Sequence, residues 1–78
     1  MTPLQIELLS RLIDADRTFH QHRKNTRHVD WDWRGVEIGG LSDIPAATAI
    51  SLERAGLVEI VSYGSHLRRA FLGSYEPI

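Results

Sequence analysis

The side chains in this sequence best suited to binding a metal are histidines. His20 and His22 are separated by one residue, His28 follows, and Asp30 or Asp32 could add a carboxylate. Neutral imidazoles and carboxylates can together hold zinc, and the chain has no cysteine. On a helix, residues two apart point about 200° away from each other. The spacing therefore fits a metal site only if a helix ends before His20, and no metal site is predicted.

Catalytic arrangements of residues are not recognisable in the sequence. It contains no nucleophile elbow, no phosphate-cradling glycine loop and no pair of carboxylates on one predicted face. The Gly39-Gly40 pair is predicted to form a turn. We therefore predict that the protein is not an enzyme and that it uses no cofactor.

Basic side chains are concentrated in residues 17–28, RTFHQHRKNTRH, a segment without an acidic residue. Arg23, Lys24 and Arg27 are its central cations. Two interpretations are open: the segment is a solvated helix end, where cations are favourable, or it contacts nucleic-acid phosphates. The net charge of the chain is −1, so any attraction to nucleic acid must be local.

The first element that would position these residues is a helix from Pro3 to about His22. Thr2 can cap its first turn, and proline is tolerated at the first helical position. Leu8, Phe19 and the leucines between them recur at helical spacing. The basic segment is therefore expected to begin on this helix and to continue beyond its end.

A strand is predicted next, because apolar and charged residues alternate. Val29, Trp31 and Trp33 share one side of this pattern, and we expect both tryptophans in the core. Gly35 shifts the alternation, so a bulge or a tight turn is expected before a short strand at residues 36–38.

The second half of the chain is predicted to form a helix and a β-hairpin. Ser42 or Asp43 is the expected cap of a helix over residues 46–54, Leu52 is expected to face the core, and Gly56 ends the helix. A strand at residues 57–62, a turn at residues 63–66 and a second strand at residues 67–72 follow. The predicted fold is a single α+β domain, residues 1–78, in the order helix, strand, helix, strand, strand.

Part of this pattern resembles a known family. The stretch LERAGLV, Leu52 to Val58, followed by a hairpin with Arg68 and Arg69, resembles the recognition helix and wing of bacterial winged helix-turn-helix regulators of the multiple-antibiotic-resistance repressor type. The resemblance covers less than half of the chain and implies a small winged-helix-like domain. No room remains for the family's second helix before residue 42, so the helix-turn-helix would be truncated or rebuilt.

The resemblance implies a DNA-binding protein, such as a small bacterial or phage transcription regulator. Its recognition helix would offer mostly alanines, which read base edges poorly, so binding would rest on phosphate contacts. Arg68 and Arg69 are adjacent on a strand, so at most one of them lies on a given surface. The expected DNA-binding residues are Arg23, Lys24, Arg27, Thr48, Ser51, Arg54, Arg68 and Arg69.

A second hypothesis follows from the apolar character of the same helix. Ala46, Ala47 and Ile50 would then dock a partner protein or a second copy, without DNA. A histidine-based metal module is the third hypothesis. The positions of the cations separate the first two, because a shared basic face favours DNA and scattered cations favour a protein partner.

Chain length also bears on association. A domain of 78 residues buries only about 60% of its unfolded surface, so a homodimer is predicted, with Leu4, Leu8 and Ile13 as interface candidates. The first residues carry no basic leader, and no apolar run reaches the roughly 18 residues of a membrane span. Together with the absence of cysteine, this predicts a cytoplasmic protein.

Overall fold

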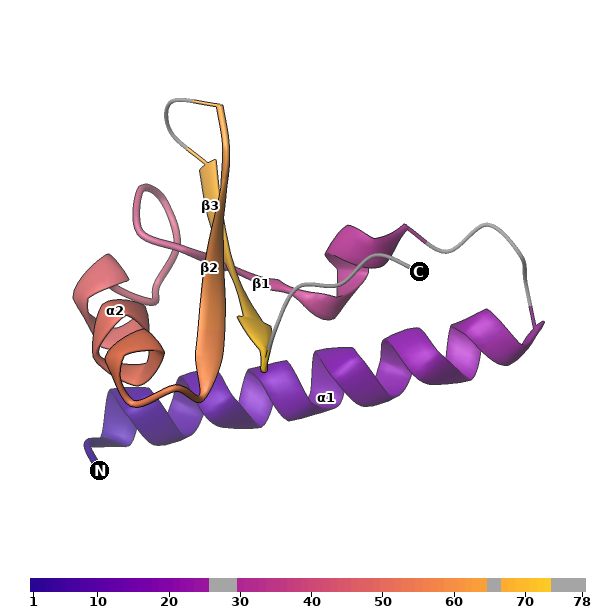
Figure 1. The fold of residues 1–78 in the computed structure, drawn as a ribbon, viewed down its shortest axis with the longest axis horizontal. Coiled ribbons are helices and arrows are strands. Elements are labelled where there is room, and N and C mark those ends of the chain that lie inside the picture. The colour runs from indigo at the N-terminus through magenta and orange to yellow at the C-terminus, as the bar shows by residue number, and fades with distance from the viewer. Residues whose placement is uncertain (26–29, 65–66, 74–78) are drawn as a thin grey trace.

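The computed structural model describes residues 1–25, 30–64 and 67–73. These residues form an α+β fold, as predicted (Figure 1). Its elements are α1 (Pro3–Asn25), the 3-10 helix η1 (Trp31–Arg34), β1 (Val36–Ile38), α2 (Ala46–Arg54), β2 (Val58–Tyr63) and β3 (Leu67–Leu72). The strands make one antiparallel sheet in the order β1-β3-β2. Among the described residues, no helix is long and apolar enough to cross a membrane.

The long helix α1 begins where the sequence predicts and ends three residues later than expected. Thr2 Oγ1 accepts a hydrogen bond from the amide of Gln5, and Gln5 Oε1 accepts one from the amide of Thr2. This reciprocal capping box fixes the first turn. Leu8 is fully buried in the core of the single chain, so its prediction as an interface residue is wrong.

The segment predicted as a tryptophan-bearing strand is instead the 3-10 helix η1. Asp30 Oδ1 accepts a hydrogen bond from the amide of Asp32, at 3.1 Å, which caps this turn. Trp31 is half-buried with its ring centroid 4.9 Å from that of Phe19, whereas Trp33 is 57% exposed and lies outside the core. The alternation is misleading here because residues far away in the sequence hold the turn: Arg34 is bonded to Asp16, and Asp32 accepts a hydrogen bond from Tyr63. Val29 lies outside the described residues.

A buried arginine joins η1 to the rest of the fold. Arg34 Nε donates to Asp16 Oδ1 on α1 at 2.6 Å, and a second guanidinium nitrogen donates to the carbonyl of Leu72. The guanidinium also lies over the ring of Trp31, 5.2 Å from its centroid. One side chain therefore links α1, η1 and β3.

The outer face of the sheet is covered where η1 crosses it. Phe71 is fully buried there, and a Cβ atom added to Gly35 would lie 2.7 Å from Phe71 Cε1. Tyr63 donates to Asp32 Oδ1 at 2.6 Å from the same face of the sheet. The glycine thus permits the close approach of this segment to the outer face of the sheet.

The second helix α2 has the predicted bounds but not the predicted cap. Its N-cap position is Pro45, which makes no side-chain hydrogen bond. Gly56 ends the helix in the left-handed region, with φ +78°, as expected. Leu52 is 2% exposed and confirms the predicted inward face. Around it, α1, α2 and the inner face of the sheet form the core cluster, which contains Leu8, Leu12, Ile38, Ile44, Ala49, Leu52, Val58 and Ala70.

Candidate functional site

The loop between β1 and α2, residues 39–45, joins the sheet directly to α2. Gly39 and Gly40 both have positive φ, which lets the chain reverse immediately after β1. The amide of Gly39 donates to the carbonyl of Ile44 at 2.7 Å, and the amide of Ser42 donates to the carbonyl of Gly39 at 2.8 Å. As the sequence predicts, this fully described connection contains no helix.

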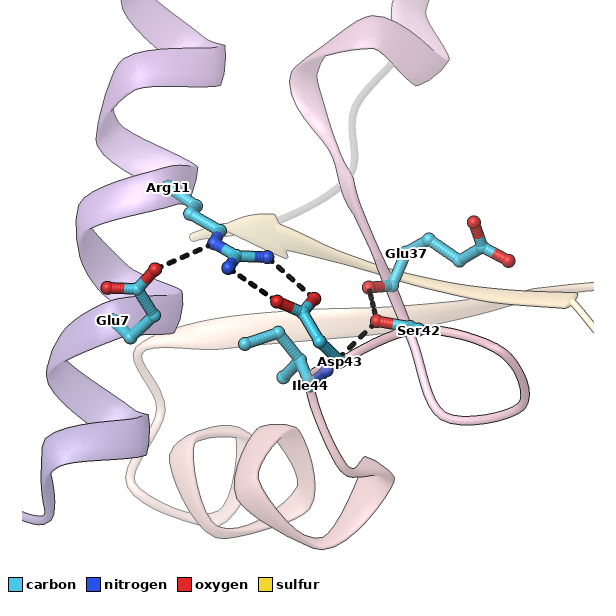
Figure 2. Close-up of polar contacts among 6 residues, drawn as sticks. All are labelled: Glu7, Arg11, Glu37, Ser42, Asp43 and Ile44. Carbon is cyan, nitrogen blue, oxygen red and sulfur yellow. Dashed lines mark hydrogen bonds and ion pairs between the residues drawn. The ribbon is translucent and has the colours of Figure 1, made fainter.

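Side chains fix the same loop to its neighbours (Figure 2). Ser42 Oγ donates to the carbonyl of Glu37 and accepts from the amide of Ile44, at 2.9 and 3.0 Å. The Asp43 carboxylate accepts two hydrogen bonds from Arg11 on α1, at 2.8 and 2.7 Å. Ser42 and Asp43, predicted as helix caps, therefore hold the loop instead.

This loop presents a leucine to solvent. Leu41 has a relative exposure of 105%, whereas Ile44, three residues later, is buried. The loop lies at the N-terminal end of α2, since a Cβ added to Gly39 would lie 3.4 Å from Ala46 Cβ. The fold thus places a fully exposed apolar side chain on a closed loop beside the first turn of α2.

The outward face of α2 agrees with the predicted helical spacing. Ala47, Ser51 and Arg54 are exposed, and Ile50 is half-buried on the same side. Ser51 Oγ accepts from Gln5 Nε2 on α1 at 2.9 Å and donates to the carbonyl of Thr48. The hydroxyl of Ser51 is therefore engaged within the protein. The other two residues of α2 that were predicted to bind DNA or a partner, Ala46 and Thr48, are half-buried at the sides of this face.

The predicted cations do not gather on α2. Arg23 and Lys24 lie in the last turn of α1, while α2 packs near the other end, where Gln5 meets Ser51. With a rise of 1.5 Å per residue, those ends of α1 are roughly 28 Å apart. Figure 1 shows α2 beside the N-terminal end of α1 and far from its C-terminal end. Arg27 lies outside the described residues.

The two hairpin arginines separate as the strand geometry predicts. Arg69 Nη1 donates to the carbonyls of Asp32 and Gly35, at 3.2 and 3.0 Å, so it holds η1 against the sheet. Arg68 is exposed on the other face of β3, opposite Ile38 and Ser62 in the strand register. Arg54 and Arg68 are therefore the predicted DNA-binding cations that remain exposed on α2 and the hairpin.

Neither a metal site nor a ligand pocket is found in the described part of the chain. His20 and His22 lie within α1, and His20 Nε2 is 3.6 Å from Asp16 Oδ1. Residues 1–25, 30–64 and 67–73 contain no group of three or more side chains suited to a metal ion. They also enclose no pocket. His28 is outside these ranges.

Sequence reasoning missed the two most informative parts of this surface. Leu41 follows two glycines and precedes a serine, a setting in which an apolar residue is exposed at a turn. The two glycines predict a turn here, but the turn alone does not indicate that Leu41 is fully exposed. The clamp between Arg11 and Asp43 joins residues far apart in the sequence, and no local pattern indicates it.

Comparison of the chain with protein-family models, with curated proteins and with solved structures finds no match. The function must therefore be inferred from the residues and their geometry.

Acid is expected to release the loop, because its clamp depends on a carboxylate. The Arg11 guanidinium holds the pKa of Asp43 below its usual value. Because the pKa of Asp43 is lower in the folded than in the unfolded protein, the clamp stabilises the folded state at pH values above the unfolded pKa of about 4. This contribution is lost as the pH falls through the folded-state pKa of Asp43. In an NMR titration, the loop amides of Gly39 and Ile44 should therefore change at a pH below 4.

The matched variant is Arg11→Met. It should move the Asp43 titration back toward the usual pKa and reduce hydrogen-exchange protection of the Gly39 amide at neutral pH. The melting temperature should change little, because the ion pair is exposed. An Asp43 that titrates identically in both proteins would contradict the clamp.

Proposed function

We propose that this protein is a winged-helix-like module that binds a partner protein. The binding surface, here called the docking face, consists of Leu41, Ala47 and Ile50, with Arg54 at its border. The order α1, β1, α2 and hairpin, together with the sheet order β1-β3-β2, supports the winged-helix-like description. The observation that carries the proposal is the fully exposed Leu41 on a loop closed by backbone and side-chain hydrogen bonds.

A fixed, protruding leucine favours binding for two physical reasons. Burying such a side chain in an apolar pocket contributes about 1.5–3 kcal/mol. A loop already held by Ser42 and by the Arg11–Asp43 pair loses little conformational entropy on binding. The partner that fits is a protein with an apolar pocket for Leu41. Carboxylates at the rim of that pocket would complement the exposed Arg54 and Arg68.

Binding to double-stranded DNA is the second candidate function. The exposed Arg54 and Arg68, on α2 and on the hairpin that follows it, favour this alternative. Three observations weigh against it: Arg69 is engaged with η1, the outward face of α2 presents an alanine, and the net charge is −1. Because the exposed cations are scattered, the partner-protein function is better supported.

Replacing the exposed leucine should strongly weaken partner binding without unfolding the protein. Leu41→Asp and Ile50→Asp each place a charge in an apolar contact, so we expect the amount of retained partner to fall by about tenfold or more. The control is Leu57→Asp, because Leu57 is 42% exposed but lies beyond the end of α2. Tagged proteins would be compared by quantitative affinity capture from cells of the source organism, and the captured protein would be purified and re-bound.

The DNA alternative is tested by titrating a random-sequence duplex at low salt and following fluorescence anisotropy. The proposed function predicts no binding at micromolar protein. Binding that weakens steeply with salt, and that is lost in an Arg54→Ala, Arg68→Ala double variant, would establish the alternative. Equal capture by the Leu41→Asp and Leu57→Asp proteins would overturn the docking face.

A further inference from the structure

One long face of α1 is left uncovered. All other elements lie on one side of this helix in Figure 1. At 100° per residue, four exposed residues of α1 fall within about 40° of one another, and they point about 140° away from the buried leucines and Phe19. We call these four residues the α1 stripe: Ile6, Ile13, Arg17 and Lys24.

The α1 stripe is apolar in its first half and basic in its second. Ile6 is 53% exposed and Ile13 is 46% exposed. Each isoleucine is followed by an exposed carboxylate, Glu7 or Asp14. Each carboxylate lies about 100° further around α1 than its isoleucine, so acidic side chains border the apolar half of the stripe while the other half is basic. This segregation of charge along the helix favours an antiparallel partner of the same kind.

We propose that the α1 stripe pairs with the same stripe of a second copy of this chain, with the two helices antiparallel. Residues 13 and 17 are equally distant from residue 15 along the helix, and so are residues 6 and 24. One antiparallel register therefore brings residue 13 opposite residue 17 and residue 6 opposite residue 24 of the second copy. Ile13 then lies opposite Arg17 of the second copy, and Ile6 lies opposite Lys24 of the second copy. The aliphatic stems of these cations cover the isoleucines, while their charged ends extend to the bordering carboxylates Asp14 and Glu7 of the other copy. Glu7 also accepts a hydrogen bond from Arg11 of its own chain, at 3.0 Å.

A two-fold axis makes every contact occur twice, so the pairing closes as a dimer. A parallel arrangement would instead place Arg17 and Lys24 beside the same residues of the other helix. The antiparallel pairing refines the dimer expected from the sequence. It uses Ile13 and excludes the buried Leu8, and it places Leu4 on another side of α1, about 160° from the stripe. It does not depend on the docking face, which lies on α2 and its preceding loop.

The first test is sedimentation equilibrium of the full chain at low salt, from low to high micromolar concentration. The wild type should show a monomer–dimer equilibrium, and Ile13→Asp should raise its dissociation constant by about tenfold or more. Leu4→Asp is the matched control, since Leu4 is 45% exposed and lies away from the stripe. Circular dichroism spectra of the variants should remain those of the wild type.

The second test reverses charges and restores them between chains. Asp14→Arg and Arg17→Glu should each weaken self-association, because each places like charges across the two-fold axis. An equimolar mixture of the two variants should recover dimers, since every facing pair is then of opposite sign. A wild type that stays monomeric, an equal effect of Ile13→Asp and Leu4→Asp, or a mixture that stays monomeric would each overturn the proposal.

Discussion

An Arg34→Met protein is expected to lose about 3 kcal/mol of unfolding free energy, a large share of the stability of a domain this small. Arg34 is 8% exposed and satisfies both the Asp16 carboxylate and the Leu72 carbonyl. Its removal leaves a carboxylate on α1 without its buried counter-charge and a β3 carbonyl without its donor. Urea unfolding followed by tryptophan fluorescence would measure the loss, because Trp31 lies directly under the guanidinium.

The control for this prediction removes the unpaired charge as well. In an Arg34→Met, Asp16→Leu double variant, much of the stability should return, since replacing a whole buried pair with apolar residues is often nearly neutral. A single Arg34→Met variant as stable as the wild type would show that Arg34 does not join α1, η1 and β3 in solution.

The second large effect is expected from Leu52→Ala, which should cost about 2–5 kcal/mol. Leu52 is 2% exposed and belongs to the core cluster between α1, α2 and the sheet. The truncation would leave a cavity that a core of this size can hardly fill by relaxation. Thermal unfolding would detect it as a decrease in melting temperature of more than about 8 °C, given the 4–8 °C per kcal/mol typical of domains this size.

Leu57→Ala is its matched control. Leu57 is five positions further along the chain and 42% exposed, so its truncation should change the melting temperature only slightly. An unchanged Leu52→Ala protein, or an equal effect at both positions, would contradict the assigned register of α2.

The regular elements of this fold were predictable because their signals are local. A cap at Thr2 and a glycine at position 56 mark the start of α1 and the end of α2, and apolar residues at helical spacing identify their inner faces. Two short β-type runs on either side of a glycine-containing turn likewise identified β2 and β3 to within one residue. Each of these features depends on residues within one or two helical turns or within one hairpin.

The parts that failed depend on long-range contacts. Trp33 was expected in the core, but the 3-10 turn of η1 exposes it, while the charged Arg34 is buried against Asp16. No local pattern indicates that an arginine will find a carboxylate on α1. The clamp between Arg11 and Asp43 is of the same kind, and the exposure of Leu41 depends on the loop that this clamp helps to hold.

The central claim is that the docking face contacts a protein, and a photo-crosslinker at position 47 tests it most directly. Ala47 is exposed on the outward face of α2, so a benzophenone amino acid placed there samples whatever binds this face in living cells. We predict a discrete, protease-sensitive protein adduct that disappears when Leu41→Asp is added. A nuclease-sensitive adduct that survives Leu41→Asp would contradict the claim and would identify α2 as a DNA-binding helix.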